Sequence, residues 1–406
     1  MKNNISNILI LFLLFVFGIN TTTFAQDNLA KDNTTPKHEI SAEEQQELWK
    51  QPDFVKAYFI VVEPGGALYS VFGHACFHMV CDAYGYDYCF TYESENAVNR
   101  ILTFLSGRLK MGMIRITLED YMADYKEEGR AVKEYEINLP IEYKRELWRV
   151  LDEKVDEGMN LPYDFVERGC AYACVIMLNE ALGNEKVEYG EWSPRFERTR
   201  PEICYDFAKR DYPWNASIIF NMIGSVAKKE TSNEKKMIMP TEVLETWQHA
   251  KFHGEYLLSM EAHELLPSVP KKESTVWFTP MLFSLILLVL AIVAMFIEKP
   301  YFDWLILSVV TVLGAILVYL VLFSTLPCTE WNWLIVPFNI LPAICWKWRK
   351  YWSLPYAVMI LIWIFGMLLS LHQMVDNAMI VLAVAFMLIV LNKRNRNHSF
   401  EKLVCK

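Results

Sequence analysis

The hydrophobic pattern divides the chain into two halves of different character. In the first half charged and apolar residues are mixed, whereas from Thr275 onwards the chain is nearly all apolar, with charges only at the breaks. Long apolar runs are typical of membrane-spanning segments. We therefore predict a globular domain over residues 26–274, a transmembrane domain over residues 275–392 and a tail over residues 393–406.

The apolar half contains five runs that we interpret as transmembrane helices. The last three are shorter than the roughly 20 residues that a spanning helix needs, so flanking residues must extend them. Tryptophans stand at the run ends, as aromatic residues do at the two membrane interfaces. The five predicted spans are Trp277–Ile297, Trp304–Phe323, Trp331–Trp346, Tyr356–Leu371 and Ala378–Leu391. We expect them to form an all-α bundle of five helices.

The globular half shows the periods of both strands and helices. Short β-rich runs predict strands at Tyr58–Glu63, Val71–Cys81 and Tyr88–Tyr92, and a turn joins the last two into a hairpin. Apolar residues at helical spacing predict an amphipathic helix over Glu142–Glu157, and Ala171–Leu182 reads as a second, more apolar helix. This mixture predicts an α+β domain.

The first 25 residues are typical of a cleavable secretory signal peptide. Lys2 precedes an apolar stretch, Ile8–Ile19, that is too short to cross a bilayer. The stretch Thr23–Ala25 ends in a small residue, where a signal peptidase would cut. We expect cleavage after Ala25 and export of the globular domain, with a retained anchor helix as the alternative.

Basic residues predict the orientation of the apolar half. If the globular domain lies outside, the outer loops at 328–330 and 372–377 hold no Lys or Arg. The inner segments then hold all the basic residues of the breaks: Lys299, Lys347, Arg349, Lys350, Lys393, Arg394 and Arg396. This agrees with the positive-inside rule. We predict a protein of the bacterial cytoplasmic (inner) membrane, with its globular domain on the periplasmic side and its C-terminus in the cytoplasm.

Charge and cysteine content exclude several classes of function. The chain carries 48 Asp and Glu against 39 Lys and Arg, a net charge of −9, which argues against nucleic-acid binding. Its nine cysteines fit neither a zinc pattern nor a regular disulfide framework. Cys76, Cys81 and Cys89 either pair in the exported domain or pack as small apolar residues. We expect no metal and no cofactor, and the sequence indicates no oligomeric state.

Cys170 and His74 are the candidate chemical pair. Cys170 begins the apolar helix, where the helix dipole and free N–H groups favour a thiolate. His74 stands at the start of a predicted strand and can act as the base that activates a thiol. Cys174 lies one turn further along the helix and is the competing nucleophile, but the dipole effect falls off within the first turn. A core cysteine and an ordinary polar histidine are the alternative interpretations.

A third group is expected to orient the imidazole of His74. A hairpin turn near residue 83 places His74 opposite residues 92–95, so Tyr92, Glu93 and Glu95 are candidates. His78 shares the face of His74 but lies roughly 13 Å away along the strand, at about 3.3 Å per residue. That separation is too large for easy contact between the two rings.

Several short motifs, taken in order, carry a resemblance to a known family. In the globular half they are Ser70-x-Phe-Gly-His74, Phe90-x-Tyr92, Phe104-x-x-Gly107-Arg-Leu109, and Tyr163-Asp-Phe165 with Cys170; in the apolar half they are Trp331-Asn-Trp333 and Pro337-Phe-Asn339-Ile-Leu-Pro342. They resemble Lnb-type lipoprotein N-acyltransferases. The family usually has Asn before the cysteine, Ser or Thr two residues after it, and Gly after the strand tyrosine; here those places hold Gly169, Tyr172 and Glu93.

The resemblance implies a permuted papain-like (NlpC-like or LRAT-like) α+β domain followed by a five-helix bundle. It implies Cys170, His74 and Tyr92 as catalytic residues, and Ser70, Gly73 and Glu93 as substrate-positioning residues. The implied reaction moves an acyl chain from an acyl ester in the outer leaflet to the N-terminal amine of lipoproteins through a cysteine thioester, without metal or cofactor. The implied partners are membrane phospholipids and lipoproteins, and the sequence does not identify the acyl donor. A membrane-anchored cysteine peptidase or amidase and a non-enzymatic envelope protein are the alternatives.

The membrane setting leads to one more expectation about geometry. The segment Leu265–Glu273, which contains two prolines, joins the globular domain to the first span and limits how far the domain can move from the bilayer. We expect the cleft between His74 and Cys170 to open toward the membrane. The outer loops with Glu330 and His372 could form its floor, and ordinary interfacial residues are the alternative there.

Overall fold

The structure is a computed structural model that describes residues 49, 51, 53–66, 70–95, 101–225, 231–269, 276–297 and 300–392. The predicted signal peptide and cytoplasmic tail lie outside these residues, and so do residues 270–273 of the predicted connection.

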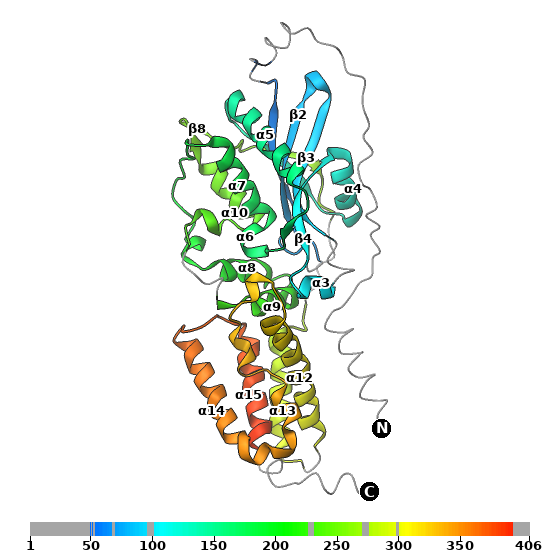
Figure 1. The fold of residues 1–406 in the computed structure, drawn as a ribbon, viewed down its shortest axis with the longest axis vertical. Helices are drawn as coiled ribbons and strands as arrows, with labels where there is room; N and C mark the ends of the chain where they lie inside the picture. Colours follow the sequence, from blue (N-terminus) through cyan, green and yellow to red (C-terminus); the bar gives the residue numbers. More distant parts are fainter. Residues whose placement is uncertain are drawn as a thin grey trace. The chain divides into compact units, whose positions relative to one another are not determined.

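A seven-stranded antiparallel sheet forms the centre of the globular domain (Figure 1). Its strand order is β6-β4-β3-β2-β1-β5-β9. The strands are β1 (Lys56–Val62), β2 (His74–Cys81), β3 (Tyr86–Ser94), β4 (Lys110–Thr117), β5 (Val132–Glu136), β6 (Leu161–Pro162) and β9 (His263–Leu266). The predicted β2–β3 hairpin is confirmed, and β2 lies in the middle of the sheet with a hydrogen-bonded partner on each side.

The two faces of the sheet are covered differently because successive side chains of a strand point to opposite faces. Phe77 and Met79 of β2 belong to the main core, with residues of α5 (Ile141–Glu157), α7 (Cys170–Leu182) and α10 (Pro240–His249). Cys76, on the other face, belongs to a smaller cluster with Tyr121 of α4 (Leu118–Glu128). The amphipathic helix and the apolar helix predicted from the sequence are thus confirmed as α5 and α7.

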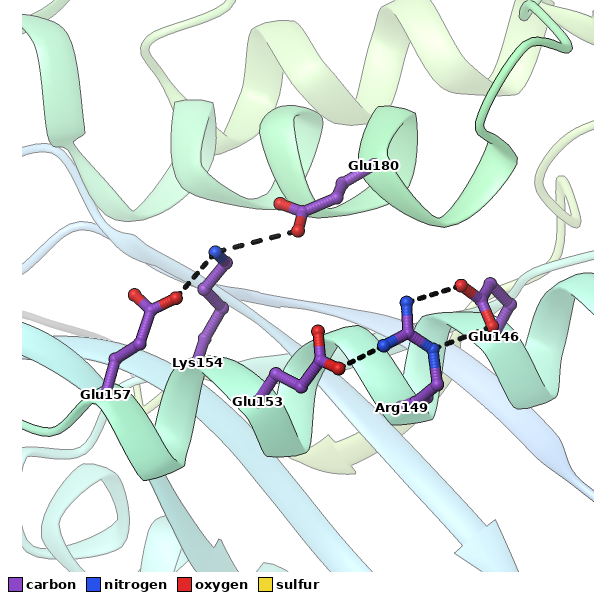
Figure 2. A network of polar contacts seen from close by, with 6 residues as sticks. All are labelled: Glu146, Arg149, Glu153, Lys154, Glu157 and Glu180. Carbon is purple, nitrogen blue, oxygen red and sulfur yellow. Dashed lines mark hydrogen bonds and ion pairs between the residues drawn. The ribbon is translucent and has the colours of Figure 1, made fainter.

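Ion pairs on the outer surface of α5 and α7 flank this packing (Figure 2). Arg149 pairs with Glu146 and Glu153 along α5, and Lys154 lies between Glu157 of α5 and Glu180 of α7, at 2.9 and 3.6 Å. Exposed pairs of this kind contribute little, about 0–1 kcal/mol each. The buried apolar stripe therefore holds the two helices together.

The remaining helices of the globular domain are short. They are α3 (Ile101–Leu105), α6 (Phe165–Arg168), α8 (Arg200–Ala208) and α9 (Pro213–Met222), with one-turn helices η1 (Asp82–Tyr84), η3 (Pro194–Glu197) and η5 (Glu234–Lys236). A small hairpin pairs β7 (Lys251–Phe252) with β8 (Glu255–Tyr256).

Four continuous helices form the apolar half within residues 276–297 and 300–392. They are α11 (Pro280–Ala294), α12 (Tyr301–Leu322), α14 (Arg349–Leu368) and α15 (Asn377–Leu391). Two stretches, Tyr301–Leu322 and Trp346–Leu368, are long and apolar enough to cross a membrane by themselves.

The third predicted span is not a continuous helix, which corrects the prediction of five. Residues 331–348 contain η7 (Trp333–Ile335), α13 (Leu341–Ile344) and η8 (Trp346–Trp348), separated by irregular backbone. Pro337 and Pro342 lie inside this run, and proline removes a backbone donor and breaks a helix. The side chain of Asn339 donates to the carbonyl groups of Ile335 and Val336, which compensates part of the lost bonding.

The broken segment still runs from one end of the bundle to the other. At one end Asn332 donates to the carbonyl of Asn221 in the globular domain, at 2.8 Å. At the other end the ring of Trp346 lies 6.3 Å from that of Trp304, near the start of α12. The predicted run therefore extends along the bundle, but its backbone is not the continuous helix that the sequence predicted.

Loops of the apolar half contact the globular domain through backbone and amide hydrogen bonds. Thr325 donates from its backbone N–H to Ser106 at 3.1 Å, and Gly224 donates to Cys328 at 2.7 Å. The side-chain oxygen of Gln373 accepts from the backbone N–H of Trp333, and the backbone N–H of Gln373 donates to Oγ of Ser225 in the globular domain. These contacts seat the domain on the loops that follow α12 and α14.

Candidate functional site

A tight turn delivers His74 to the end of β2. Gly73 has φ of +77°, and a Cβ there would lie 2.5 Å from the carbonyl oxygen of Val62, so this position requires glycine. The carbonyl of Ser70 accepts from the backbone N–H groups of Gly65 and Gly73, at 2.8 and 2.9 Å. The structure thus gives Ser70 and Gly73 a part in shaping the backbone that holds His74.

Cys170 is the first residue of α7, as predicted. The preceding single turn, α6, is capped by Asp164, whose carboxylate accepts from the N–H groups of Val166 and Glu167 at 3.0 and 3.1 Å. Gly169 then forms the N-cap of α7, and a Cβ there would lie only 2.9 Å from the carbonyl oxygen of Phe165. The close approach explains why this chain has glycine directly before the cysteine.

Cys170 and His74 interact directly. Burial raises the pKa of the Cys170 thiol, but the charge and hydrogen bond of His74, with a hydrogen bond from the backbone N–H of Ala75, hold it below its ordinary value. Burial lowers the pKa of His74, but the oxygen of Tyr125, the sulfur of Cys170 and the carboxylate of Glu93 together raise it well above its ordinary value. Both shifts favour a thiolate–imidazolium pair at neutral pH.

Thr91 and Glu93 hold the other side of the imidazole. The Nε2 atom of His74 lies 2.6 Å from Oγ1 of Thr91 and 3.2 Å from Oε1 of Glu93. The Thr91 hydroxyl donates to the same carboxylate at 2.9 Å. Because Nε2 is occupied in this way, Nδ1 is the ring nitrogen left to face the thiol.

The Glu93 carboxylate is suited to orient a charged imidazole. Burial raises its pKa, but the charge and hydrogen bond of His74, together with the hydrogen bond from Thr91, hold it below the ordinary value. The expected contact between His74 and a glutamate after Tyr92 is therefore present.

Thr91 was missed by the sequence reasoning. Its only signal was its spacing of two residues from Glu93, which puts both on one face of β3.

The structure does not bring Tyr92 to His74. The β2–β3 register pairs Cys76 with Thr91, which continues to put Glu93 opposite His74. Tyr92, one residue earlier, points to the other face and packs against the main core. Its hydroxyl lies near Arg168, Glu157 and Lys154.

The remaining candidates lie apart from the imidazole. The carboxylate of Glu95 accepts from the backbone N–H of Lys110 at 3.3 Å. Cys174 is buried, and burial raises the pKa of its thiol well above the ordinary value. Cys174 therefore stays protonated at neutral pH, and the electrostatics favour Cys170 as the reactive thiol.

Aromatic residues of α4 flank His74 on the face of the sheet that carries Cys76. The ring of Tyr121 lies 6.4 Å from the ring of His74, and Tyr125 packs edge-on against Tyr121 at 5.1 Å. Arg130 stacks over Tyr125, with its guanidinium carbon 4.9 Å from the ring centre. These rings shield the His74 side of the site from water.

The apolar half approaches the site through the loop after α12. Cys328 packs with Val166 of α6, the turn that leads into α7, and with Ile223 at the end of α9. Burial, then the neighbouring Cys328 and Cys170, raise the pKa of Tyr163. His372 lies elsewhere, stacked between the rings of Trp333 and Trp363, so it caps α14 rather than the site.

The cysteines and carboxylates of the described residues are not arranged for metal binding. No group of three or more His, Cys, Asp or Glu is placed to hold a metal ion in that part of the chain. The eight cysteines that the structure describes are free thiols, including Cys76, Cys81 and Cys89. These three cysteines form no disulfide in the structure and are buried, which agrees with packing as small apolar residues.

Two family models match the chain, one in each half. The model of the Lnb N-terminal periplasmic domain matches residues 45–194, which contain His74 and Cys170. The model of the Lnb transmembrane domain matches residues 271–396, which contain the apolar helices. The fold and these matches define an inner membrane protein with a periplasmic N-terminal α+β domain.

The chain belongs to the Lnb-type family, as its motifs predicted. No curated protein and no solved structure is significantly similar to it. The permuted papain-like relationship of the α+β domain therefore stays a prediction.

Proposed function

We propose that this protein is a thiol-dependent acyltransferase that moves an acyl chain from a membrane phospholipid to the N-terminal amine of a lipoprotein. One observation carries the proposal: Cys170 at the start of α7 shares a hydrogen bond with His74, whose Nε2 is held by Thr91 and Glu93. A thiolate beside an imidazolium is the activated form of the nucleophile in thiol enzymes. Membership of the Lnb-type family supports the membrane-bound setting.

In the first half-reaction the Cys170 thiolate attacks the ester carbonyl carbon of the phospholipid. A C–S bond forms, the ester C–O bond breaks, and the departing oxygen takes the proton of the His74 imidazolium to leave as the lysolipid alcohol. The first turn of α7 has N–H groups without intrahelical partners, which are suited to stabilise the developing oxyanion. The acyl chain then stays on sulfur as a thioester.

In the second half-reaction the lipoprotein amine attacks the thioester carbonyl. His74, now neutral, takes a proton from the attacking nitrogen, the amide C–N bond forms and the C–S bond breaks. The thiolate and the imidazolium are restored together. Thr91 and Glu93 keep the ring in one orientation and stabilise its positive charge through both steps.

The membrane setting fits this substrate. Removing an acyl chain from the bilayer costs about 0.8 kcal/mol for each CH₂ group, so free diffusion of such a substrate is strongly disfavoured. The site lies on a domain whose backbone is hydrogen-bonded to the loops of the apolar helices. Both substrates can therefore react without leaving the lipid.

The test is the covalent intermediate. Purified full-length protein is incubated with a phospholipid that carries a labelled acyl chain, and the labelled adduct is released with hydroxylamine. We expect an adduct on the wild type and on Cys174→Ala, and none on Cys170→Ala. Lipidated product made without any adduct would contradict the thioester step. Cleavage of cell-wall peptides by a protein that forms no lipidated product would favour an amidase.

A further inference from the structure

Helix α3 presents an exposed apolar residue next to the apolar half of the protein. Leu102 has 73% of its surface exposed, although leucine is among the residue types most often buried. A single exposed leucine is common on soluble surfaces and proves nothing by itself. Its meaning depends on what lies beside it.

The end of α3 is in backbone contact with the end of α12. Thr325 donates to the carbonyl of Ser106 from both its N–H and its hydroxyl, each at 3.1 Å. A Cβ on Gly107, whose φ is +73°, would lie only 2.3 Å from the backbone nitrogen of Leu326. The two backbones therefore touch, and α3 lies at the level where α12 ends.

The end of α12 is itself an exposed apolar surface. Leu322 and Phe323 have 65% and 69% of their surfaces exposed, at the last turn of a helix long and apolar enough to span a bilayer. Side chains in this position contact lipid in a membrane protein. The exposed apolar surface at the end of α12 therefore lies next to α3.

Cations follow directly after α3. Arg108 and Lys110 are exposed, and Lys110 begins β4. An apolar side chain flanked by exposed basic residues is typical of a segment that lies in the interface of a membrane. There the apolar group contacts acyl chains and the cations contact phosphates.

We propose that α3 is a membrane-contact element that places Leu102 in the interfacial region of the outer leaflet and Arg108 at phosphate depth. The occupant of this surface is bilayer lipid, because the exposed apolar residues Leu322 and Phe323, at the end of a helix long and apolar enough to span a bilayer, lie at the same level. This inference does not depend on the acyl-transfer chemistry, since it concerns only where the domain meets the bilayer.

The contact has a consequence for the site. The ring of Phe104 on α3 packs edge-on against the ring of Tyr163 at 5.5 Å. Tyr163 precedes α6 and lies near Cys170, as the effect of that thiol on its pKa indicates. A helix fixed in the interface thereby fixes the depth of the segment that carries the thiol.

Photo-cross-linking to lipid tests the proposal in the full-length protein in lipid nanodiscs. A benzophenone amino acid is placed at position 102, at position 323 as the lipid-facing reference, and at position 260 as the control. Met260 is 62% exposed and apolar, and its neighbour Ser259 bonds to Glu136, at the end of β5 away from His74. These exposed positions tolerate a bulky probe without loss of fold.

We expect position 102 to capture labelled phospholipid at a level close to position 323 and several-fold above position 260. Arg108→Gln should lower capture at position 102 in anionic nanodiscs and leave capture at position 323 unchanged. Capture at position 102 no higher than at position 260 would overturn the proposal. Neither readout requires an active enzyme, so this failure is distinguishable from failure of the proposed reaction.

Discussion

His74 and His78 lie on the same strand and the same face of the sheet, yet their surroundings differ. Both nitrogens of His78 face carboxylates, Glu134 at 2.6 Å and Asp87 at 2.8 Å. His74 has hydroxyl and carboxylate oxygens on Nε2 only, and its other side faces the thiol of Cys170. Both ring nitrogens of His78 are occupied by carboxylates, whereas one ring nitrogen of His74 faces the thiol of Cys170.

The comparison separates electrostatics from function. Burial lowers the pKa of both rings, and in both cases neighbouring groups outweigh burial and raise it. A raised pKa therefore does not identify the reactive histidine, because a structural ion pair gives the same shift. What distinguishes His74 is that its second ring nitrogen faces a thiol, that of Cys170, and not a carboxylate. The experiments below test that distinction.

The largest effect is expected from removing the reactive ring. His74→Ala should lower the rate of thioester formation by about 10²–10⁴-fold, the range for losing a general acid–base group. His78→Gln is the matched control on the same strand and should keep most of the rate in protein that remains folded. The rate at which the labelled acyl adduct forms on the protein measures the effect of both substitutions. Equal losses in the two variants would mean that His74 has no special part in the chemistry.

Alkylation of Cys170 should depend on His74. An ordinary thiol with a pKa of about 8.5 is only about 1% ionised at pH 6.5, so losing the imidazolium, which lowers the pKa of Cys170, should slow alkylation at that pH, by at most about a hundredfold if the thiol then behaves as an ordinary one. The wild-type rate should hold as the pH falls from 8.5 and decline only below the lowered pKa of Cys170. Mass spectrometry of iodoacetamide adducts gives the rate, with Cys174 as the internal control. A wild-type rate that falls tenfold per pH unit below 8.5 would contradict the ion pair.

Removing the imidazole of His78 should lower the free energy of unfolding, whereas removing that of His74 lowers the reaction rate. His78→Gln leaves the Glu134 carboxylate, whose side chain is 8% exposed, without its closest charge partner. Breaking a buried pair typically costs about 3–5 kcal/mol, and the exposed Asp87 adds little. Thermal unfolding in detergent measures the loss. The double variant His78→Gln with Glu134→Gln should recover part of it, and no recovery would mean that the charge pair is not the cause.

Removing either group that contacts Nε2 of His74 should have an intermediate effect on the rate of thioester formation. Glu93→Gln keeps the size of the side chain but removes its charge, and we expect thioester formation to slow by about tenfold, equivalent to about 1.4 kcal/mol. Thr91→Val removes the hydroxyl that bridges ring and carboxylate and should act in the same direction. Because the charge of Glu93 raises the pKa of both His74 and Cys170, the acid limb of the alkylation profile should move to lower pH in Glu93→Gln. A slower rate with an unchanged profile would indicate a structural role.

The smallest effect is the pH dependence of the His78 ion pair. The folded pKa of His78 is raised, so its stabilising contribution is complete below the unfolded value of about 6.5 and is lost as the pH rises through the folded value. The groups around the ring are Glu134, Asp87, the stacked Tyr58 and, near Glu134, His263. The difference in unfolding temperature between wild type and His78→Gln should therefore shrink above pH 6.5. A difference that grows with pH would reverse the assignment.

The sequence predicted that Cys170 and His74 lie together, but it did not predict every group that contacts the imidazole. Hairpin periodicity put His74 opposite residues 92–95, and the observed register selects Glu93. Tyr92 was chosen on resemblance, but strand alternation directs it to the other face. Thr91 reaches the ring diagonally, and such contacts depend on the register and twist of two strands, which local sequence does not determine.

In the apolar half the composition of the sequence correctly predicted four of the five runs as helices. It failed for the third one because composition reports how apolar a run is, not whether its backbone is helical. Pro337 and Pro342 were visible, but their effect depends on partners that are distant in the sequence. The Tyr356 hydroxyl of α14 accepts a bond from Asn339 at 3.1 Å, and only the folded bundle supplies that contact.

The broken third crossing has a consequence for how the protein is made. Gly314 of α12 lies so close to Asn339 that a Cβ on it would be 2.7 Å from that backbone, so α12 forms one wall for the irregular segment. Irregular backbone is tolerated at membrane depth only where protein covers it. We therefore expect the segment not to enter lipid as an independent unit during synthesis. The contacts with α12 and α14 lead us to expect that these three stretches insert into the membrane together.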